Sequence, residues 1–280
     1  MATRKHTVSV VTPVRNVEDR LERFLDALTW ADEVVLIDQF STDRTAEIAA
    51  RYPNVTFIQS DDFVPRNYNL GQERARGEWI LRLDSDEIPS PELVREIEAI
   101  LSEEEIPYDG YYVPQRVYFF GKWIRYGIAY TPGAPAGCSY RKGFYRKGYA
   151  RYPGRSYHDD LESRGRWGYL HHPYDHYSHA SVSEWIAKMN HYTDGDLAQM
   201  PLDDPSYRPP RPWRALLDVP LTFVKLYFLR RGYRDGRHGL IVCGLNALYA
   251  FVQACKIWEA LEKRRLRIAD GTPAGKGERD

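Results

Sequence analysis

The sequence predicts an α/β fold in which a mostly parallel sheet is flanked by helices and followed by a C-terminal helical hairpin. Four β-branched or apolar runs alternate with helical patterns between residues 7 and 83, and this alternation is typical of βαβ units. Two further apolar segments, 216–229 and 240–258, follow a proline-rich stretch and predict the hairpin. The chain has 280 residues, of which 43% are hydrophobic, so it can bury a sizeable core.

The N-terminal elements follow from local patterns. The run 7–14 contains Pro13 near its end and precedes apolar residues at i, i+3, i+4 and i+7 spacing, which predicts a strand and then a half-buried helix. Those apolar residues are Leu21, Phe24, Leu25 and Leu28. Further strands are predicted at 33–37, 55–58 and 79–83, and further helices at 45–52 and 67–75. Ligands of such sheets bind at the carboxyl ends of the strands.

The elements after residue 90 are less regular. Ser90 followed by Pro91 predicts a helix start, with Ser as the N-cap and Pro at the first helical position. A strand rich in aromatic residues is predicted at 111–120, and a helix at 182–192. Between them, 121–168 is rich in Gly, Pro, Tyr and Arg, which predicts short strands and loops over the binding edge of the sheet.

The charges and the cysteines narrow the class of protein. The 39 Lys and Arg residues offset the 39 Asp and Glu residues, and this balance gives no indication of nucleic-acid binding. Residues 206–267 nevertheless carry thirteen Lys or Arg and four Asp or Glu, a local net charge of +9. Cys138, Cys243 and Cys255 lack the paired spacing of a disulfide framework or a zinc site, and no secretory signal is recognisable. We therefore expect a cytoplasmic protein.

Two carboxylates stand at the end of the predicted strand 79–83. Asp84 and Asp86 are separated by one residue, and their mutual repulsion in a turn favours a bound cation. Mg²⁺ or Mn²⁺ prefers one or two carboxylates together with phosphate oxygens, so the pair indicates a diphosphate substrate. The alternative is an acidic loop that caps the next helix, but Ser90 already supplies that cap.

Several segments resemble the motifs of the family 2 glycosyltransferases, which have the GT-A fold. In the first 100 residues these are VSVVTPVRN at 8–16, VLID and STDRT at 35–45, PRN at 65–67 and GEWILRLDSDE at 77–87. Downstream segments resemble the branch that includes lipopolysaccharide-core β-glucosyltransferases: FFGKWI at 119–124, YHDDL at 157–161, YDHY at 174–177, KMNHY at 188–192 and GYRDG at 232–236. The resemblance extends over nearly the whole chain.

The resemblance implies a nucleotide site along the edge of the sheet. In this family the exit of the first strand lies against the base, an acid after the second strand contacts the base or ribose, and an arginine and the first aspartate of the pair contact the nucleotide. The matching residues are Thr12, Pro13, Arg15, Asp38, Arg66 and Asp84.

The resemblance also implies a metal site and a catalytic base. Asp86 matches the metal ligand, and His176 matches a histidine that reaches the metal or the diphosphate, with a structural histidine as the alternative. Inversion at the anomeric carbon requires a base opposite the leaving diphosphate. The branch has His-Glu where this chain has His158 followed by two aspartates, so Asp159 is the implied base and Asp160 the second choice. An acidic helix start is the structural alternative for both.

The acceptor side is implied by aromatic residues. Trp123 and Tyr126 either stack on sugar rings or pack within the protein, and His158 is a further acceptor-binding candidate.

The basic C-terminal region predicts association with a membrane. Polar residues such as Asp218, Asn246 and Lys256 interrupt both apolar segments, so neither is expected to be a clean membrane-spanning helix. A helical pair lying on an anionic membrane surface fits this composition. The alternative is a hairpin that packs on the sheet or between the subunits of a homo-oligomer.

These patterns predict the domain organisation. The predicted parts are a GT-A domain at 1–200 with a nucleotide-binding half at 1–105 and an acceptor half at 106–200, a proline-rich linker at 201–212, a membrane-associating helical region at 213–268, and a disordered tail at 269–280.

The sequence thus predicts a metal-dependent, inverting hexosyltransferase that is peripheral at the inner face of the cell membrane. From the resemblance, the donor is a nucleotide sugar with UDP-glucose as first choice, and the acceptor is a lipid-linked or cell-envelope saccharide. Two alternatives are a non-catalytic membrane-associated scaffold and a sugar nucleotidyltransferase. The latter requires a Gly-rich phosphate loop with a basic residue after the first strand, and residues 12–16 contain no glycine.

Overall fold

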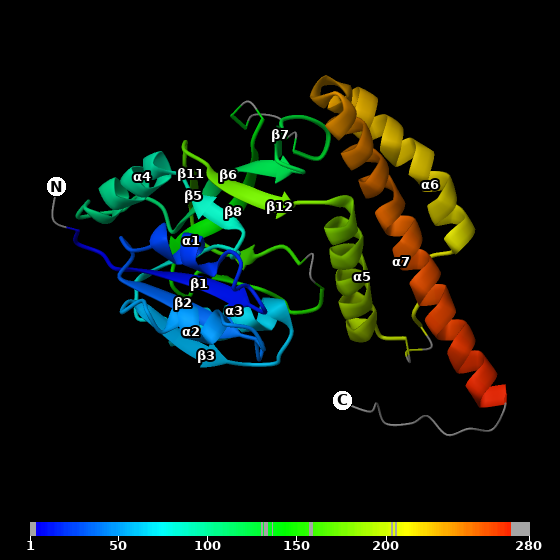
Figure 1. Ribbon diagram of the computed structural model, residues 1–280, viewed down its shortest axis with the longest axis horizontal. Coiled ribbons are helices and arrows are strands. Elements are labelled where there is room, and N and C mark those ends of the chain that lie inside the picture. Colours follow the sequence, from blue (N-terminus) through cyan, green and yellow to red (C-terminus); the bar gives the residue numbers. More distant parts are fainter. Residues whose placement is uncertain are drawn as a thin grey trace. The chain divides into compact units, whose positions relative to one another are not determined.

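The computed structural model describes residues 4–129, 131, 134–135, 137–156, 159–202, 204 and 206–269, the last three by their backbone alone (Figure 1). The chain divides into two compact units. The described residues of the first lie within Met1–Arg125 and Ala129–Val182, and those of the second within Tyr126–Ile128 and Ser183–Asp280. The predicted functional boundaries at 200, 212 and 268 stay a prediction.

The first unit is built on one large sheet. Its strands follow the order β3-β2-β1-β4-β8-β6-β12-β5, and β7 and β11 also pair with β6. The bounds are β1 (Val8–Val14), β2 (Glu33–Asp38), β3 (Val55–Gln59), β4 (Trp79–Arg82), β5 (Glu87–Pro89), β6 (Gly110–Phe119), β7 (Lys122–Ile124), β8 (Ser139–Arg146), β11 (Trp167–Tyr169) and β12 (Tyr174–His179). A separate two-stranded ribbon consists of β9 (Ala150–Arg151) and β10 (Glu162–Ser163).

The predicted βαβ half of the sheet is confirmed. β1 pairs in parallel with both β2 and β4, and β2 pairs in parallel with β3. The intervening helices are α1 (Leu21–Asp26), α2 (Thr45–Ala49) and α3 (Val64–Arg74). The other half is mixed, because β8 runs antiparallel to both β4 and β6 whereas β12 is parallel to β6.

Helices cover both faces of this sheet. On one face, buried residues of α1, α2 and α4 (Pro91–Leu101) belong to the same apolar cluster as alternate residues of β1 such as Val10 and Val14. On the other face, α3 packs on Val11 of β1 and Ile37 of β2. Tyr145 of β8 belongs to the same apolar cluster. α4 begins as predicted, because the Ser90 hydroxyl accepts a hydrogen bond from the backbone N–H three residues later at 3.1 Å.

The second unit is helical and contains the predicted hairpin. Its helices are α5 (Val182–Gln199), α6 (Pro212–Val224) and α7 (Arg237–Ala269). α6 continues into a π-helical turn, Lys225–Leu229, and a 3₁₀ turn, Gly232–Asp235, before α7 runs back along it. Lys256 of α7 forms a 2.6 Å ion pair with Asp194 of α5, so all three helices are connected.

The segment Arg237–Leu266 of α7 is, by length and composition, able to cross a membrane, and 28% of its most apolar stretch is buried in the chain. The polar residues Asn246 and Lys256 therefore do not disqualify this segment as a span, contrary to the sequence-based expectation. Core helices of soluble proteins can have the same length and composition.

Candidate active site

The exits of three parallel strands meet at one edge of the sheet. The last residue of β1 lies opposite Asp38, and Val11 of β1 lies opposite Arg82, the last residue of β4. Leu83 N donates to Val11 O at 3.4 Å, which extends the pairing to the residue before Asp84. Asp38 and Asp84 therefore lie at the edge where α/β sheets bind their ligands.

The predicted residues at the exits of β1 and β2 differ in accessibility. Thr12 is buried, and its hydroxyl lacks a hydrogen-bond partner in the described part of the chain. Asp38 is 1% exposed and accepts a hydrogen bond from Ser41 N at 3.1 Å. Pro13 is half-buried and Arg15 is exposed, and the roles of these four residues in nucleotide binding stay a prediction.

The two aspartates of the predicted pair lie in a turn closed by two hydrogen bonds. Glu87 N donates to Asp84 O, and Asp84 N donates to the carboxylate of Glu87, each at 2.9 Å. The carbonyl of Asp86 accepts a hydrogen bond from Tyr177 N at 2.9 Å, which attaches the turn to β12. Both aspartates are consequently held by the backbone of neighbouring strands.

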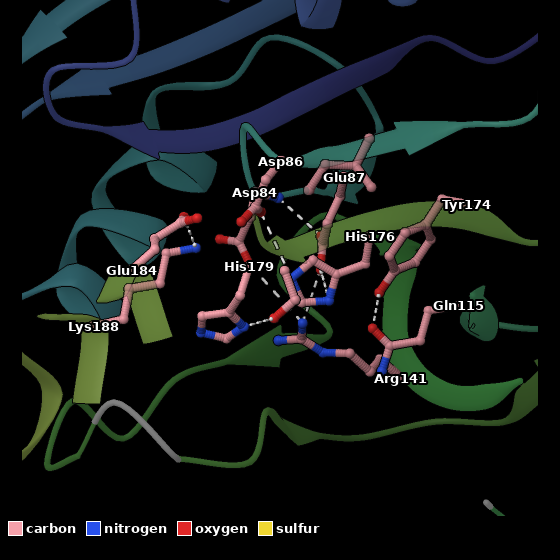
Figure 2. A network of polar contacts seen from close by, with 12 residues as sticks. Asp84, Asp86, Glu87, Gln115, Arg141, Tyr174, His176, His179, Glu184 and Lys188 are labelled. Atoms are coloured by element: carbon pink, nitrogen blue, oxygen red, sulfur yellow. Dashed lines mark hydrogen bonds and ion pairs between the residues drawn. The ribbon is translucent and has the colours of Figure 1, made fainter. Parts of the chain in front are cut away.

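His176 of β12 lies next to this turn, as Figure 2 shows. It stands opposite Glu87 in the antiparallel pairing of β12 with β5, and its Nε2 is 3.7 Å from Asp86 Oδ1. The structure therefore brings together the two residues that the resemblance implies as metal ligands, although they are far apart in the sequence.

The pair formed by Asp86 and His176 fits a divalent cation whose coordination is completed from outside the protein. Mn²⁺ can bind both a carboxylate and an imidazole, whereas Mg²⁺ prefers oxygen ligands such as the carboxylate. Within the described ranges no group of three or more His, Cys, Asp or Glu side chains is arranged to hold a metal. The remaining ligands would therefore be substrate phosphates and water.

Behind the turn lies a network of two cations and two anions. Arg82 contacts Asp84 at 2.6 Å and Glu87 at 3.4 Å. Arg141 of β8 contacts Glu87 at 3.0 Å and lies 3.9 Å from the Asp84 carboxylate. Because the Glu87 side chain is fully buried, its charged form is disfavoured by burial and favoured by the ion pairs with these arginines.

The network shifts the two acids in opposite directions. Burial disfavours the charged form of Asp84, but the nearby charges of Arg82 and Arg141 outweigh it and hold the pKa of Asp84 well below its usual range. Burial and the charge of Asp84 together raise the pKa of Glu87. Asp84 is therefore the stronger acid of the pair.

Tyr68 of α3 contributes a further contact to Asp84. Its hydroxyl donates to the Asp84 carboxylate, and the Arg82 guanidinium lies 4.7 Å from the centre of the Tyr68 ring. Burial raises the pKa of Tyr68, so the hydroxyl remains a donor at neutral pH. The orientation of Asp84 is thus fixed from two elements, β4 and α3.

The start of α3 lies against the loop that leads to the predicted base. A Cβ atom on Gly154 would lie 2.9 Å from Cγ of Arg66, and the side chain of Asn69 bonds to both the N–H and the carbonyl of Tyr152 at 2.9 Å. Arg66 is exposed and forms an ion pair with Asp62 at 3.3 Å. The loop after β9 therefore begins beside a predicted nucleotide-binding residue.

The candidate bases lie further along this loop. The carboxylate of Asp159 accepts a hydrogen bond from Arg155 N at 2.6 Å, and Asp159 N donates to Ser156 O at 3.2 Å. Asp159 is half-buried and Asp160 is exposed, so both carboxylates are open to solvent. His158 lies outside the described residues.

The two aromatic acceptor candidates contact arginines. In the first unit, the guanidinium groups of Arg125 and Arg116 lie 4.2 and 5.8 Å from the centre of the Trp123 ring. In the second unit, Arg234 lies 5.1 Å from the centre of the Tyr126 ring. Both rings take part in packing, and their role in acceptor binding stays a prediction.

Three residues of the network, and Tyr68 beside it, were not predicted as site residues. Two of them carry a signal in the sequence: Arg82 is a charged residue inside an apolar run, and Glu87 directly follows the aspartate pair. Tyr68 and Arg141 carry no local signal, because helix and strand patterns do not reveal which of their side chains face the strand exits.

Comparison with known proteins identifies the family. The model of glycosyl transferase family 2 matches residues 9–173, which is more than half of the chain. The chain belongs to glycosyl transferase family 2. The predicted resemblance is therefore confirmed, and so is the α/β fold of GT-A type with its additional helical hairpin.

Relatives of this glycosyltransferase are found in several bacteria. The lipopolysaccharide core biosynthesis glycosyltransferase LpsC of Rhizobium meliloti is 28% identical over 259 residues, which cover 87% of this chain and 89% of LpsC. An uncharacterized glycosyltransferase of Rickettsia bellii is 25% identical over 267 residues, or 92% of this chain and 88% of that protein. The crystal structure of Staphylococcus aureus TarS 1–349 with UDP-GlcNAc superposes with a TM-score of 0.49 at 18% identity, covering 89% of this chain and 81% of that one.

Proposed function

We propose that this glycosyltransferase is metal-dependent and inverting, and that it transfers a hexose from a UDP-linked donor to a lipid-linked or cell-envelope saccharide. The observation that carries the metal-dependent part is the 3.7 Å separation of Asp86 and His176 beside the exit of β4. UDP-glucose is the first donor to test, because the sequence resembles the lipopolysaccharide-core β-glucosyltransferases.

The donor side of the reaction rests on groups at the sheet edge. Asp84, held by Arg82 and Tyr68, is preorganised to accept hydrogen bonds from the ribose hydroxyls. Arg66 would bind the nucleotide by charge. A divalent cation held by Asp86 and His176 would offset the negative charge that develops on the departing diphosphate.

The acceptor side rests on Asp159. Its carboxylate takes the proton of the acceptor hydroxyl while that oxygen forms a bond to the anomeric carbon, and the bond from this carbon to the diphosphate oxygen breaks with its electron pair. A single displacement of this kind inverts the anomeric centre. Asp160, the next residue, is the second candidate for the base.

The acceptor class is supported by the relative LpsC. LpsC is named for lipopolysaccharide core biosynthesis and aligns over most of both chains. We infer an acceptor of the same chemical class, a saccharide of the cell envelope carried on a lipid.

Donor hydrolysis tests the activity without knowledge of the acceptor. A panel of nucleotide sugars is incubated with the full chain, with Mn²⁺ or with EDTA, and released UDP is measured. We expect Mn²⁺-dependent breakdown of a UDP-hexose and a loss of about a hundredfold or more in Asp86→Asn, since a metal supplies several kcal/mol of transition-state stabilisation.

The matched control is Glu47→Gln, which removes one negative charge from an exposed residue of α2. This variant should retain the activity of the wild type. Equal hydrolysis by Asp86→Asn and the wild type would overturn the metal-dependent mechanism. No turnover of any nucleotide sugar by the wild type would favour the non-catalytic scaffold.

We also propose that the second unit attaches the enzyme to an anionic membrane surface at the cytoplasmic face. α6 and the turn after it expose large apolar side chains, among which Leu221 is 67% and Leu229 74% exposed. Exposed cations accompany them, including Arg231, Arg234 and Arg237. Apolar side chains among cations match the chemistry of an anionic lipid interface, which contributes about 1 kcal/mol per Lys or Arg near the surface.

Vesicle sedimentation tests this attachment. The wild type should sediment with vesicles of phosphatidylglycerol and phosphatidylcholine, and less with phosphatidylcholine alone. The double variant Leu221→Ser and Leu229→Ser should lose binding, whereas Tyr169→Ser, which changes an exposed apolar residue of the first unit, should not. If the wild type does not bind lipid but forms dimers, and the double variant no longer forms them, the results would instead favour the homo-oligomer.

A further inference from the structure

Glu87 is the one acid of the strand-exit turn that no ligand can reach. Its side chain is 0% exposed, whereas those of Asp84 and Asp86 are 34% and 14% exposed. Its carboxylate accepts the N–H of Asp84 at 2.9 Å and pairs with Arg141 at 3.0 Å. Glu87 therefore acts on the site through its neighbours.

Arg141 is the partly exposed arginine of the same network. Its side chain is 35% exposed, against 6% for Arg82, and Figure 2 shows it converging with Glu87 beside His176. It lies 3.9 Å from the Asp84 carboxylate. An arginine in this position attracts anions and repels cations at the strand exits unless another charge offsets it.

The network is electrically balanced when Glu87 is ionised in its pair with Arg141. Arg82 and Arg141 then offset the charges of Asp84 and Glu87, so the network beside the Asp86–His176 pair has no net charge. Glu87 supplies the second negative charge without occupying space in the site. His176 Nδ1 is 3.9 Å from Glu87, which places this charge close to the histidine as well.

We propose that Glu87 is a positioning residue that holds the Asp84–Asp86 turn and offsets the charge of Arg141, so that the Asp86–His176 pair takes a divalent cation together with the nucleoside diphosphate. This inference rests on the proposed function, because it concerns the same cation and the same diphosphate. Arg141 is the opposing residue that attracts the diphosphate itself.

Changes that remove one charge from this network have opposite effects on the two ligands. Glu87→Gln keeps the size of the side chain and an oxygen that can accept the Asp84 N–H, but leaves one uncompensated positive charge. This charge weakens the binding of a cation and strengthens the binding of an anion. Arg141→Gln leaves one uncompensated negative charge and does the reverse. A general disturbance of the fold would weaken the binding of both ligands.

The test measures the two ligands separately on the full chain. UDP affinity is measured by titration calorimetry in EDTA, and Mn²⁺ affinity is measured from the electron paramagnetic resonance signal of free Mn²⁺ at saturating UDP. For Glu87→Gln we expect a Kd for Mn²⁺ about tenfold higher, a change of about 1.4 kcal/mol, and a lower Kd for UDP in EDTA. For Arg141→Gln both changes should have the opposite sign.

Two further variants complete the test. The double variant of Glu87→Gln and Arg141→Gln restores the charge balance, so its Kd for Mn²⁺ should return toward that of the wild type. Glu47→Gln, which removes an exposed charge of α2 that pairs with Arg51, should change neither Kd. If Glu87→Gln does not fold, Arg141→Gln and the double variant still test the sign of the effect.

The outcomes separate this inference from the proposed function. If the wild type binds UDP and Mn²⁺ but Arg141→Gln and Glu87→Gln weaken both ligands or neither, the charge-balance role of Glu87 is overturned. If the wild type binds no Mn²⁺ in the presence of UDP, the metal-dependent function itself is wrong.

Discussion

Gly71 in the middle of α3 allows that helix to lie close to the sheet, and Gly71→Ala tests whether this closeness matters. A Cβ atom at this position would lie 2.4 Å from Cγ1 of Val11 and 2.5 Å from Cδ1 of Ile37. Carbon atoms in contact are normally about 3.5–4.0 Å apart, so α3 would have to move outward by about 1 Å. The same helix carries Tyr68, whose hydroxyl orients Asp84.

Two effects of opposite sign determine the stability of Gly71→Ala. Alanine in a helix gains about 1 kcal/mol over glycine, whereas overpacking a core costs about 1–3 kcal/mol. Because Val11 and Ile37 are both buried, we expect overpacking to win and the free energy of unfolding to fall by about 1 kcal/mol. Misplacing Tyr68 by about 1 Å should also lower kcat/KM for donor hydrolysis, by up to a hundredfold.

Urea unfolding followed by far-UV circular dichroism measures the stability, with Gly244→Ala as the control. Gly244 lies in α7, and no atom of the described residues comes within 4 Å of the place of a Cβ, so alanine there should stabilise by up to about 1 kcal/mol. If Gly71→Ala is as stable as the wild type or more stable, α3 does not depend on the close approach at this position, and our account of its packing is refuted.

Three other predictions concern single side chains. Burial raises the pKa of Glu33, but hydrogen bonds from Arg76 N and two hydroxyls outweigh it, so this pKa lies below its ordinary value of 4.5. Glu33→Gln should therefore lower the free energy of unfolding by about 2 kcal/mol at pH 7. This difference, measured by urea unfolding, should shrink as the pH falls below 4.5 through the lower folded-state pKa, and a constant difference would contradict it. Asp159→Asn should abolish transfer to an acceptor while Asp160→Asn retains it, as measured by product formation, and the reverse result would assign the base to Asp160. Tyr68→Phe should raise the KM for the donor several-fold. The melting temperature should change little, because Asp84 keeps its ion pair with Arg82. An unchanged KM would show that Tyr68 does not contribute to donor binding.

The parts of the fold that depend on local pattern could be predicted from the sequence. The strands β1 to β4 are short apolar runs flanked by turn residues, and they lie where the runs predict them. β12 was not predicted as a strand, because its sequence, YDHYSH, is polar and becomes a strand only through pairing with β5 and β6. Such pairing depends on residues far away in the chain, which periodicity does not report.

The candidate site likewise combines residues that the local sequence reveals with residues that only the tertiary structure brings together. Asp84 and Asp86 could be identified from the sequence because they follow a buried strand. Arg141 could not be, because it reaches Glu87 only through the antiparallel packing of β8 beside β4 and β6. The buried ion network is a tertiary feature, and its only local signs are a charged residue within an apolar strand and an acid directly after the aspartate pair.

The three-residue segment Tyr126–Ile128 belongs to the helical unit although the residues before and after it belong to the sheet unit. Tyr126 N donates to the buried carboxylate of Asp235 at 2.9 Å, and Gly127 N donates to Arg230 O at 2.9 Å. The polypeptide thus passes from one unit to the other at three points rather than at one. A shortened gene that stops at codon 182, where the sheet unit ends, would deprive both amides of their acceptors, so an attempt to crystallise the sheet unit alone should also replace these three residues with a tight glycine-containing connection.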